Sequence, residues 1–245
     1  MAYQDDIKKA AALLLPWNKL SGCNILVTGA TGLIGGCLVD VLMAHKGRNY
    51  NVYASGRNEE RAGRRFLKYA DDNSFHFVKY DVAHPLEYDV NFQYIIHAAS
   101  GAYPEEFIKH PVEVIKGNIN GVDNLMGYGI QHGIKRLLYI SSGEVYGEGD
   151  GRVFTENYSG YVDCTSLRSC YPSSKRAAET LCISYGAEYG IDVVIARPCH
   201  VYGPGFTESD NRVYAQFIRN VLRKENIVMK STGEQYRSLI HISEP

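Results

Sequence analysis

The sequence predicts an α/β fold in which a doubly wound parallel sheet is followed by a small, apparently truncated C-terminal lobe. Three observations predict this class: strand-like and helix-like segments alternate over the first 200 residues, the strand-like segments are apolar throughout, and several end in Gly, Asp or Ser. Continuously apolar strands are typical of a parallel sheet covered on both faces, and right-handed crossovers then give the doubly wound order. We expect residues 1–200 to form this domain and residues 201–245 a partial lobe.

The elements are expected in alternating order. The strands are CNILVTG (23–29), NVYASG (51–56), FHFVKYD (75–81), FQYIIHAAS (92–100), IKRLLYISS (134–142) and IDVVIARP (191–198), with NIVM (226–229) as a short strand of the lobe. The helices span 33–45, 58–70, 111–133, 171–190 and 213–224, where apolar residues recur at helical spacing. In such sheets the ligand lies outside the carboxyl ends of the strands, so the residues that end each strand are the candidates for function.

The composition excludes several classes. Hydrophobic residues make up 45% of the chain, the formal net charge is -1 and the pI is about 6.7, so no nucleic-acid partner is expected. The run AAALLLP (10–16) is too short for a membrane span and follows no basic leader, so we expect no signal peptide and no membrane contact. We interpret it instead as part of a short surface helix with Asp5 near its N-cap. The six cysteines show no CxxC or metal-type spacing, which favours reduced thiols, a cytoplasmic protein and no metal site.

The segment VTGATGLIGG (27–36) joins the first strand to the first helix of the sheet. It places Gly29, Gly32 and Gly35 at a spacing of three. Glycines are needed there for a tight turn, for close approach of a pyrophosphate and for helix packing, and the helix N-terminus attracts the anion. The strand–turn–helix context makes this fingerprint specific. The segment therefore predicts a Rossmann-type dinucleotide site.

The second strand lacks the acidic residue that usually binds the adenosine ribose. It runs instead into Ser55, Gly56, Arg57 and Asn58. Arg57 could neutralise a ribose 2′-phosphate, which would favour NADP, or it could be a solvated arginine at a helix start, so the choice between NAD and NADP stays open. Asp81, at the end of the third strand, is either an adenine contact or a strand-end cap.

Two motifs suggest a catalytic group. Tyr171 and Lys175 lie four residues apart and hence on one helix face. A tyrosine with a pKa near 10 is a poor base at neutral pH, but a neighbouring ammonium and a positive nicotinamide ring would favour its phenolate. The second motif is ISSGEVYG (140–147). Alone it would be interpreted as a turn with a solvated Glu144.

With these motifs the chain resembles the extended short-chain dehydrogenase/reductase superfamily, specifically its nucleotide-sugar epimerases, dehydratases and decarboxylases. The motifs that carry the resemblance are TGATGLIG, HAAS (97–100), Asn118 in GNINGVDNL, ISSGEVYG, YPSSK and ARPCHVYGPG. The stretch 156–181, with DNRVYAQFI and GEQYRS later, looks most like UDP-glucuronate decarboxylases. The resemblance implies NAD as cofactor, a nucleotide-sugar substrate, oxidation of the sugar at carbon 4, and a role in polysaccharide biosynthesis.

The resemblance also assigns residues. Tyr171 would be the base, Ser142 would orient the substrate, Lys175 would lower the tyrosine pKa and bind the nicotinamide ribose, and Glu144 would act on the 4-keto intermediate. The implied cofactor-binding residues are Gly29, Thr31, Gly32, Leu33, Ile34, Gly35, Arg57, Asp81, Val82, Ala98, Ala99, Ser100, Asn118, Tyr171, Lys175 and Pro198. The implied substrate-binding residues are Ser142, His200, Arg212 and Arg237.

The residues at positions 143 and 144 distinguish the reaction types of the enzymes that the chain resembles. Dehydratases carry an Asp–Glu pair there, and Gly143 stands at the Asp position, which argues against a dehydratase. Decarboxylases keep the Glu, whereas simple 4-epimerases have small apolar residues at both positions. A decarboxylase is therefore favoured and a UDP-sugar 4-epimerase is the alternative. Two departures affect the substrate: Gly143 replaces a hydroxyl residue of the decarboxylases, and His200 replaces an asparagine.

Three further expectations follow. Family members commonly form homodimers through the helix after the fourth strand and the helix that carries Tyr171, so a homodimer is expected. The rival class is a non-catalytic dinucleotide-sensing protein, but such proteins typically lose the tyrosine or the lysine. The final SLIHISEP (238–245) stands where the family continues its sugar lobe and resembles translated adapter sequence, so we expect part of the lobe to be missing.

Overall fold

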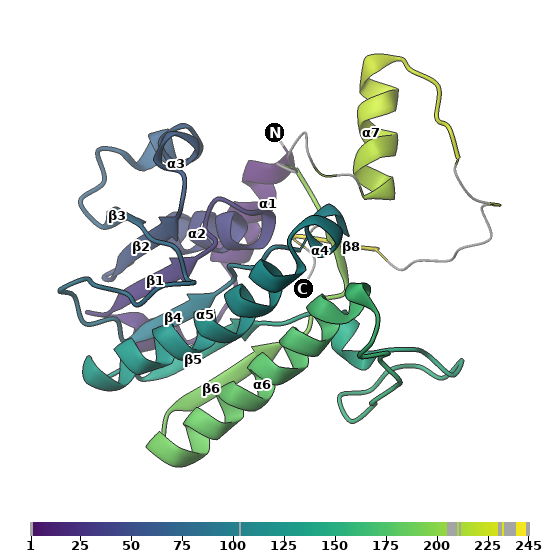
Figure 1. Ribbon diagram of the computed structural model, residues 1–245. Helices are drawn as coiled ribbons and strands as arrows, with labels where there is room; N and C mark the ends of the chain where they lie inside the picture. Colours follow the sequence, from purple (N-terminus) through teal and green to yellow (C-terminus); the bar gives the residue numbers. More distant parts are fainter. Residues whose placement is uncertain are drawn as a thin grey trace.

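The computed structural model describes residues 2–102, 104–204, 210, 212–229, 232 and 239–243. Its centre is a six-stranded parallel sheet with the order β3-β2-β1-β4-β5-β6 (Figure 1). The strands are β1 (Asn24–Thr28), β2 (Asn51–Gly56), β3 (Phe75–Lys79), β4 (Tyr94–His97), β5 (Arg136–Ile140) and β6 (Asp192–Ala196). The predicted doubly wound sheet is confirmed, and its order reverses between β1 and β4.

Helices cover both faces of this sheet. The helices are α1 (Ala2–Ala11), α2 (Leu33–Ala44), α3 (Glu59–Phe66), α4 (Pro104–Lys109), α5 (Pro111–Gln131), α6 (Cys170–Tyr189) and α7 (Val213–Arg223). Of these, α2, α3, α5 and α6 pack against the sheet, whereas α7 stands apart from it (Figure 1). One apolar core lies under α5 and α6, around Leu125, Leu137 and Tyr139. The other lies under α2 and α3, around Val27, Val39 and Phe66. Strands buried on two faces need apolar residues at most positions. This arrangement explains why the strand segments of the sequence do not alternate between apolar and polar residues.

The N-terminal helix differs from the prediction in two ways. α1 begins at Ala2, so Asp5 lies in its first turn and not at its N-cap. It is also not a simple surface helix, because Ile7 and Ala11 are buried and α1 contacts α2. The acidic side chain of Asp5 still lies near the positive end of the helix, which is the position it favours.

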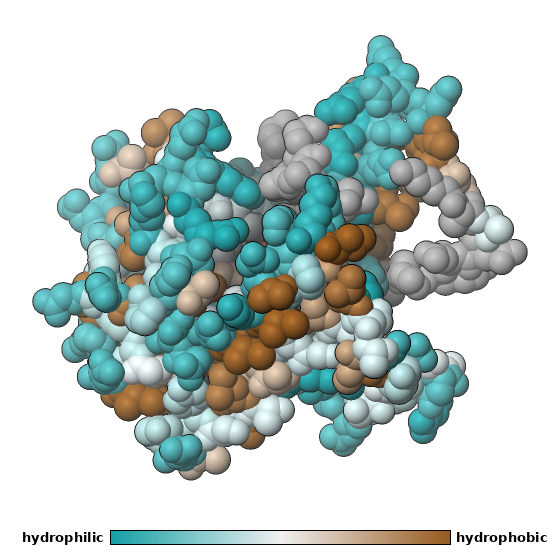
Figure 2. Space-filling model, in the orientation of Figure 1, coloured by the Kyte–Doolittle hydropathy of each residue, from teal (hydrophilic) through white to brown (hydrophobic). Residues whose placement is uncertain are grey.

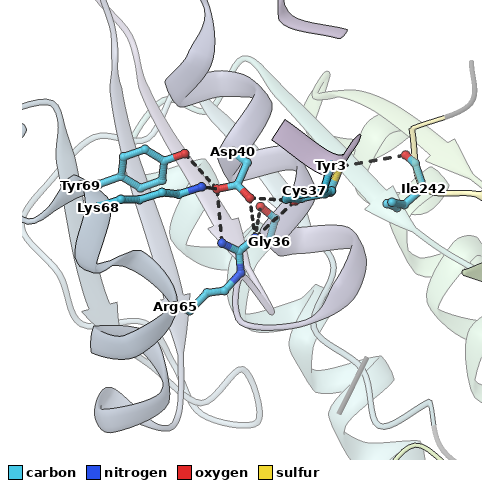
Figure 3. Close-up of polar contacts among 8 residues, drawn as sticks. All are labelled: Tyr3, Gly36, Cys37, Asp40, Arg65, Lys68, Tyr69 and Ile242. Atoms are coloured by element: carbon cyan, nitrogen blue, oxygen red, sulfur yellow. Dashed lines mark hydrogen bonds and ion pairs between the residues drawn. The ribbon is translucent and has the colours of Figure 1, made fainter. Parts of the chain in front are cut away.

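A buried carboxylate ties α1, α2 and α3 together (Figure 3). Asp40 on α2 is fully buried and accepts hydrogen bonds from Arg65 at 2.5 Å, Tyr3 at 2.7 Å and Tyr69 at 2.9 Å. Lys68 Nζ lies 2.8 Å from the same carboxylate. We call these five residues the Asp40 cluster. Although burial alone would raise the pKa of Asp40, Arg65 and Lys68 hold it below its usual range.

After β6 the structure describes only three further elements, in the region predicted to form a lobe. β7 (His200–Tyr202) pairs with β8 (Leu239–His241) in a separate two-stranded parallel sheet, and α7 confirms the predicted helix over 213–224. The predicted strand over NIVM is wrong: residues 226–229 carry no strand, and Ile227, Val228 and Met229 are exposed. An apolar run forms a strand only when a neighbouring strand pairs with it, and no described segment does so here. Among the described residues, no helix is long and apolar enough to cross a membrane.

Candidate active site

The glycine-rich loop lies between β1 and α2 at the point where the sheet order reverses. Gly29 has φ +65°, and a Cβ there would lie 2.6 Å from the backbone oxygen of Ala98. A Cβ on Gly35 would lie 2.4 Å from the backbone oxygen of Gly29. These two glycines are therefore required by the chain itself. Gly32 is the N-cap of α2, and a Cβ there would meet only the Gly29 oxygen, at 3.2 Å, so this position leaves room for an anion at the helix N-terminus.

Two arginines lie near this loop, Arg57 just after β2 and Arg61 on α3. Arg57 has a side chain that is 79% exposed and lies 3.8 Å from Asp81. The Asp81 carboxylate also accepts from the backbone N–H of Ala83 at 3.1 Å, so it does act as a cap. Arg61, which the sequence reasoning treated only as part of a basic helix face, donates to the backbone oxygen of Thr31 at 2.8 Å. The structure thus brings Thr31, Arg57, Arg61 and Asp81 to one edge of the predicted adenosine site.

A chain of polar contacts connects the end of β4 to α6. Ser100 donates to Asn118 on α5 at 2.8 Å, and Asn118 donates to Ser174 on α6 at 2.9 Å. Ala98 is hydrogen-bonded to the backbone oxygen of Thr28 at 3.3 Å, and Ala99 to the hydroxyl of that threonine at 3.4 Å. Predicted cofactor residues after β4 and on α5 therefore meet at the carboxyl end of the sheet, and Ser174, which was not predicted, joins them from α6. Leu33 and Ile34 begin α2, and Val82, next to Asp81, accepts from Asn124 on α5.

Tyr171 and Lys175 are both buried at this edge. The ammonium of Lys175 donates to the backbone oxygen of Ile140 at 2.9 Å and lies 5.9 Å from the centre of the Tyr171 ring. Burial lowers the pKa of Lys175 to about 7. Burial likewise raises the pKa of Tyr171, while hydrogen bonding to Ser142 and Ser100 favours its phenolate. Lys175 thus lies beside the tyrosine, but its hydrogen bond goes to the end of β5, so its activating role stays a prediction.

The loop after β5 forms the short 3-10 turn η3 (Gly143–Tyr146). Ser142 caps this turn and accepts from the backbone N–H of Glu144 at 3.2 Å. Gly143 donates to the backbone oxygen of Pro198 at 2.9 Å, and a Cβ at position 143 would lie 2.8 Å from Cys199 Sγ. ISSGEVYG therefore forms a turn, as its composition predicts, and this turn is compatible with the predicted catalytic roles of Ser142 and Glu144. Cys199 fills the space that a side chain at position 143 would need.

A buried network holds the start of this loop. Glu179 on α6 accepts from the hydroxyl of Ser141 at 2.5 Å and from Arg197 at 2.6 Å. Arg197 also donates to the backbone oxygen of Glu156 at 2.8 Å. The network fixes the peptide that leads into Ser142 because its partners come from β5, α6 and the segment after β6. Glu179 belongs to no motif that would have marked it in the sequence.

The Glu144 carboxylate has a partner that the sequence reasoning missed. Arg168, in the 3-10 turn η4 (Leu167–Ser169), donates to both oxygens of Glu144 at 2.8 Å each. Its guanidinium lies 4.7 Å from the centre of the Phe107 ring. Phe107 stacks on Tyr171 with ring centres 4.7 Å apart. The one available signal was the position of Arg168, three residues before Tyr171.

The remaining predicted residues lie farther out or outside the described part. His200 is exposed on β7, and Arg212 begins α7, where it donates to Asp210. Arg237 lies outside the described residues. His97 is fully buried with a pKa lowered to about 3 by burial, and its Nδ1 lies 2.8 Å from Thr28 Oγ1. Within the described ranges no group of three or more His, Cys, Asp or Glu could hold a metal ion.

A three-glycine loop before a helix N-terminus, together with a Tyr–Lys pair on α6 and a serine just after β5, defines a dinucleotide-binding protein with the site of a short-chain dehydrogenase/reductase. The chain belongs to the NAD dependent epimerase/dehydratase family, whose model matches residues 25–244. This match confirms the superfamily predicted from the motifs.

Relatives with curated names agree with the family. UDP-glucuronic acid decarboxylase 6 of Arabidopsis thaliana is 36% identical over 227 residues, which cover 91% of this chain and 64% of the relative. UDP-glucuronic acid decarboxylase 1 of Xenopus tropicalis is 33% identical over 222 residues, covering 90% of this chain and 51% of the relative. The chain thus spans between half and two thirds of the length of these relatives.

Solved structures share the fold. The UDP-N-acetylglucosamine 4-epimerase of Methanobrevibacter ruminantium superposes with a TM-score of 0.76 at 25% identity, over 91% of this chain and 70% of that one. The UDP-glucuronic acid 4-epimerase of Bacillus cereus, crystallised with NAD, gives a TM-score of 0.72 at 24% identity over 89% and 69%. The latter likeness concerns the fold alone.

Proposed function

We propose that the protein is an NAD-dependent nucleotide-sugar enzyme that acts through a 4-keto sugar, and specifically a decarboxylase of UDP-glucuronate or a closely similar nucleotide uronate. One observation carries the proposal: Glu144 follows Ser142 at the carboxyl end of β5, close enough for its charge to act on Tyr171, and the position before it is a glycine whose side-chain space Cys199 occupies. A lone carboxylate suits a decarboxylase, whereas a dehydratase needs a second acid there. The relatives named UDP-glucuronic acid decarboxylase support the same reading.

NAD fits the glycine loop. Gly29 and Gly35 let the loop close, Gly32 leaves the N-terminus of α2 open, and Asp81 and Arg57 lie at the adenosine edge. When bound, the cofactor accepts a hydride from the sugar and later returns it. NADP is the second candidate, because Arg57 just after β2 could neutralise a ribose 2′-phosphate, and Arg61 reaches the backbone oxygen of Thr31 in the same region.

The chain's own residues then have separate tasks. Ser142 orients the carbon 4 hydroxyl, and Tyr171 takes its proton. Once carbon 4 is a ketone, the bond between carbon 5 and the carboxylate breaks, CO₂ leaves, and the electron pair forms an enolate that takes up a proton at carbon 5. Glu144 is proposed to supply that proton. His200, Arg212 and Arg237 are proposed to contact the nucleotide sugar.

A UDP-sugar 4-epimerase is the second candidate. The observation that favours it is the pairing of both Glu144 oxygens with Arg168, since a carboxylate held in this way could serve binding and leave Tyr171 as the acting base and acid. The fold match to a UDP-N-acetylglucosamine 4-epimerase agrees with this alternative. A non-catalytic dinucleotide sensor is disfavoured, because Tyr171 and Lys175 are both present and buried together.

We further propose a homodimer formed through α5 and α6. Figure 2 shows apolar residues gathered along α5 and beside α4. Ile108, Val112 and Ile115 are exposed there, and Ile183 is exposed on α6. Packing two copies of α5 and α6 together would remove such side chains from water. In this form the protein would act in the cytoplasm, in the synthesis of sugar donors for polysaccharides.

The experiment is a screen of the full-length protein against UDP-, dTDP-, CDP- and GDP-sugars, with products identified by mass and NMR. UDP-glucuronate should yield CO₂ and a UDP-linked pentose. Tyr171→Phe should still bind the substrate but lose turnover by about 10²–10⁴-fold, since the proton acceptor is gone. Release of a carbon 4 epimer with no CO₂ would replace the decarboxylase with the epimerase, and no conversion of any sugar would contradict both.

A further inference from the structure

The ion pair between Glu144 and Arg168 joins two turns that are 24 residues apart in the chain. Glu144 belongs to η3 after β5, and Arg168 to η4 just before α6. The two side chains are 41% and 48% exposed. Arg168 is the only partner of the Glu144 carboxylate among the described hydrogen bonds and ion pairs, and it reaches both oxygens with one nitrogen. The direction of the carboxylate is therefore set by this one arginine.

Arg168 is itself held in place by an aromatic platform. Its guanidinium lies over the ring of Phe107, which is 3% exposed and stacks on Tyr171 at an interplanar angle of 24°. The sulfur of Cys170 also lies 3.8 Å from the backbone oxygen of Phe107. The order in space is thus Tyr171, Phe107, Arg168 and Glu144. Phe107 and Arg168 thus connect the proposed base Tyr171 to the Glu144 carboxylate.

Stability does not explain this arrangement well. A half-exposed ion pair contributes about 0–1 kcal/mol to folding, because solvent screens it and two long side chains lose freedom. A glutamate with that exposure and no partner would sample several rotamers. Misplacing a catalytic group by about 1 Å can cost about 10²-fold in rate. The larger effect of the pair is therefore on the direction of the Glu144 carboxylate.

We propose that Arg168 is a positioning residue that holds the Glu144 carboxylate toward the sugar for the step after oxidation of carbon 4, with Phe107 as its support. The inference rests on the proposed function, because it assumes that Glu144 acts on the 4-keto sugar. It assigns Arg168 no direct contact with the substrate. Its effect should therefore fall on turnover and not on substrate binding, and should disappear when Glu144 can no longer act.

The test is a double-mutant cycle in the full-length protein. Arg168→Met keeps the length of the side chain over Phe107 but removes the donors, and Glu144→Gln removes the carboxylate. The two single variants, the double variant and Arg168→Lys are compared for kcat, KM and affinity for the nucleotide sugar by calorimetry. The matched control is Arg136→Met. Arg136 has the same side-chain exposure of 48% and pairs with Asp192. These two residues begin β5 and β6, at the opposite end of the strands from Glu144.

The expected result is a specific pattern. Arg168→Met lowers kcat about 10²-fold, leaves KM and affinity within about twofold, and lets reduced nicotinamide build up during a turnover. Adding it to Glu144→Gln changes kcat no further, because both changes remove the same function. Arg168→Lys restores part of kcat, and the control variant retains wild-type values.

Three outcomes would overturn the inference while leaving the proposed function intact. They are full activity of Arg168→Met, an equal loss of kcat in the Glu144→Gln background, and a KM raised more than about tenfold, which would make Arg168 a substrate contact. A wild-type protein that converts no nucleotide sugar would overturn the proposed function, and this inference with it.

Discussion

Two carboxylates of this protein form ion pairs that differ in burial and in the number of partners. Asp40 is fully buried, and two cations and two phenols surround it. Glu144 is 41% exposed and has one arginine partner. The buried group has no surface left for a ligand, whereas the exposed one keeps a side open to whatever enters the site. The comparison indicates that a saturated carboxylate serves the fold and a singly held one serves chemistry.

The largest effect is expected from Glu144→Gln. The substitution keeps the shape of the side chain but removes its charge and its ability to carry a proton, so turnover should fall by about 10²–10⁴-fold. Because the site is half exposed, the melting temperature should change little. Steady-state kinetics and thermal unfolding on the same preparation measure both quantities. Near wild-type turnover would mean that Glu144 is as structural as Asp40, and the contrast between them would be lost.

The opposite pattern is expected from Asp40→Asn. The neutral amide removes the counter-charge of the partly exposed Arg65 and Lys68 and weakens hydrogen bonds at a fully buried position, so the free energy of unfolding should fall by about 2 kcal/mol. Turnover per folded molecule should stay close to wild type, because α2 holds Asp40 away from the Tyr171 site. Urea unfolding and kinetics at low temperature test this. A stable but inactive variant would show that the Asp40 cluster also shapes the cofactor loop.

The pH dependence of stability should report the same cluster. The pKa of Asp40 is lower in the folded chain than in the unfolded chain, mainly because Arg65 and Lys68 outweigh burial. Its stabilising contribution is therefore present above the unfolded pKa of about 4 and is lost as the pH falls through the folded value. Unfolding measured from pH 6 downward should show a steeper loss for wild type than for Asp40→Asn. Parallel curves would mean that other carboxylates dominate.

A smaller effect is expected at Gly143, next to Glu144. An alanine Cβ there would lie 2.8 Å from Cys199 Sγ, so Gly143→Ala should cost about 1 kcal/mol of stability. Gly143→Ala combined with Cys199→Ala should recover most of that loss. Gly63→Ala on α3 is the control, because nothing lies within 4 Å of a Cβ there. If both alanine variants unfold alike, Cys199 moves aside freely and does not restrict position 143.

Much of the fold could be predicted because it is encoded locally. The sequence alone predicts the six strands, the glycine loop and the shared helix face of Tyr171 and Lys175, and the structure contains all of them. Apolar continuity, turn glycines and helical period each act within a few residues, so a single sequence shows them. The wrong predictions concern features that depend on contacts between distant segments. NIVM has strand composition, but no described strand pairs with it. The helix α1 starts before Asp5 and packs on α2.

The sequence by itself determined the class of fold, the strand ends at which function lies, and the residue types that chemistry would need. Only the tertiary structure decided which of these residues meet. Asp40 and Arg65 are 25 residues apart and Glu144 and Arg168 are 24 apart, and neither spacing has a period that predicts contact. Lys175 likewise donates to Ile140 on the neighbouring strand. Such pairs depend on strand order and on the paths of loops, which are set by the packing of the whole chain and not by any local segment.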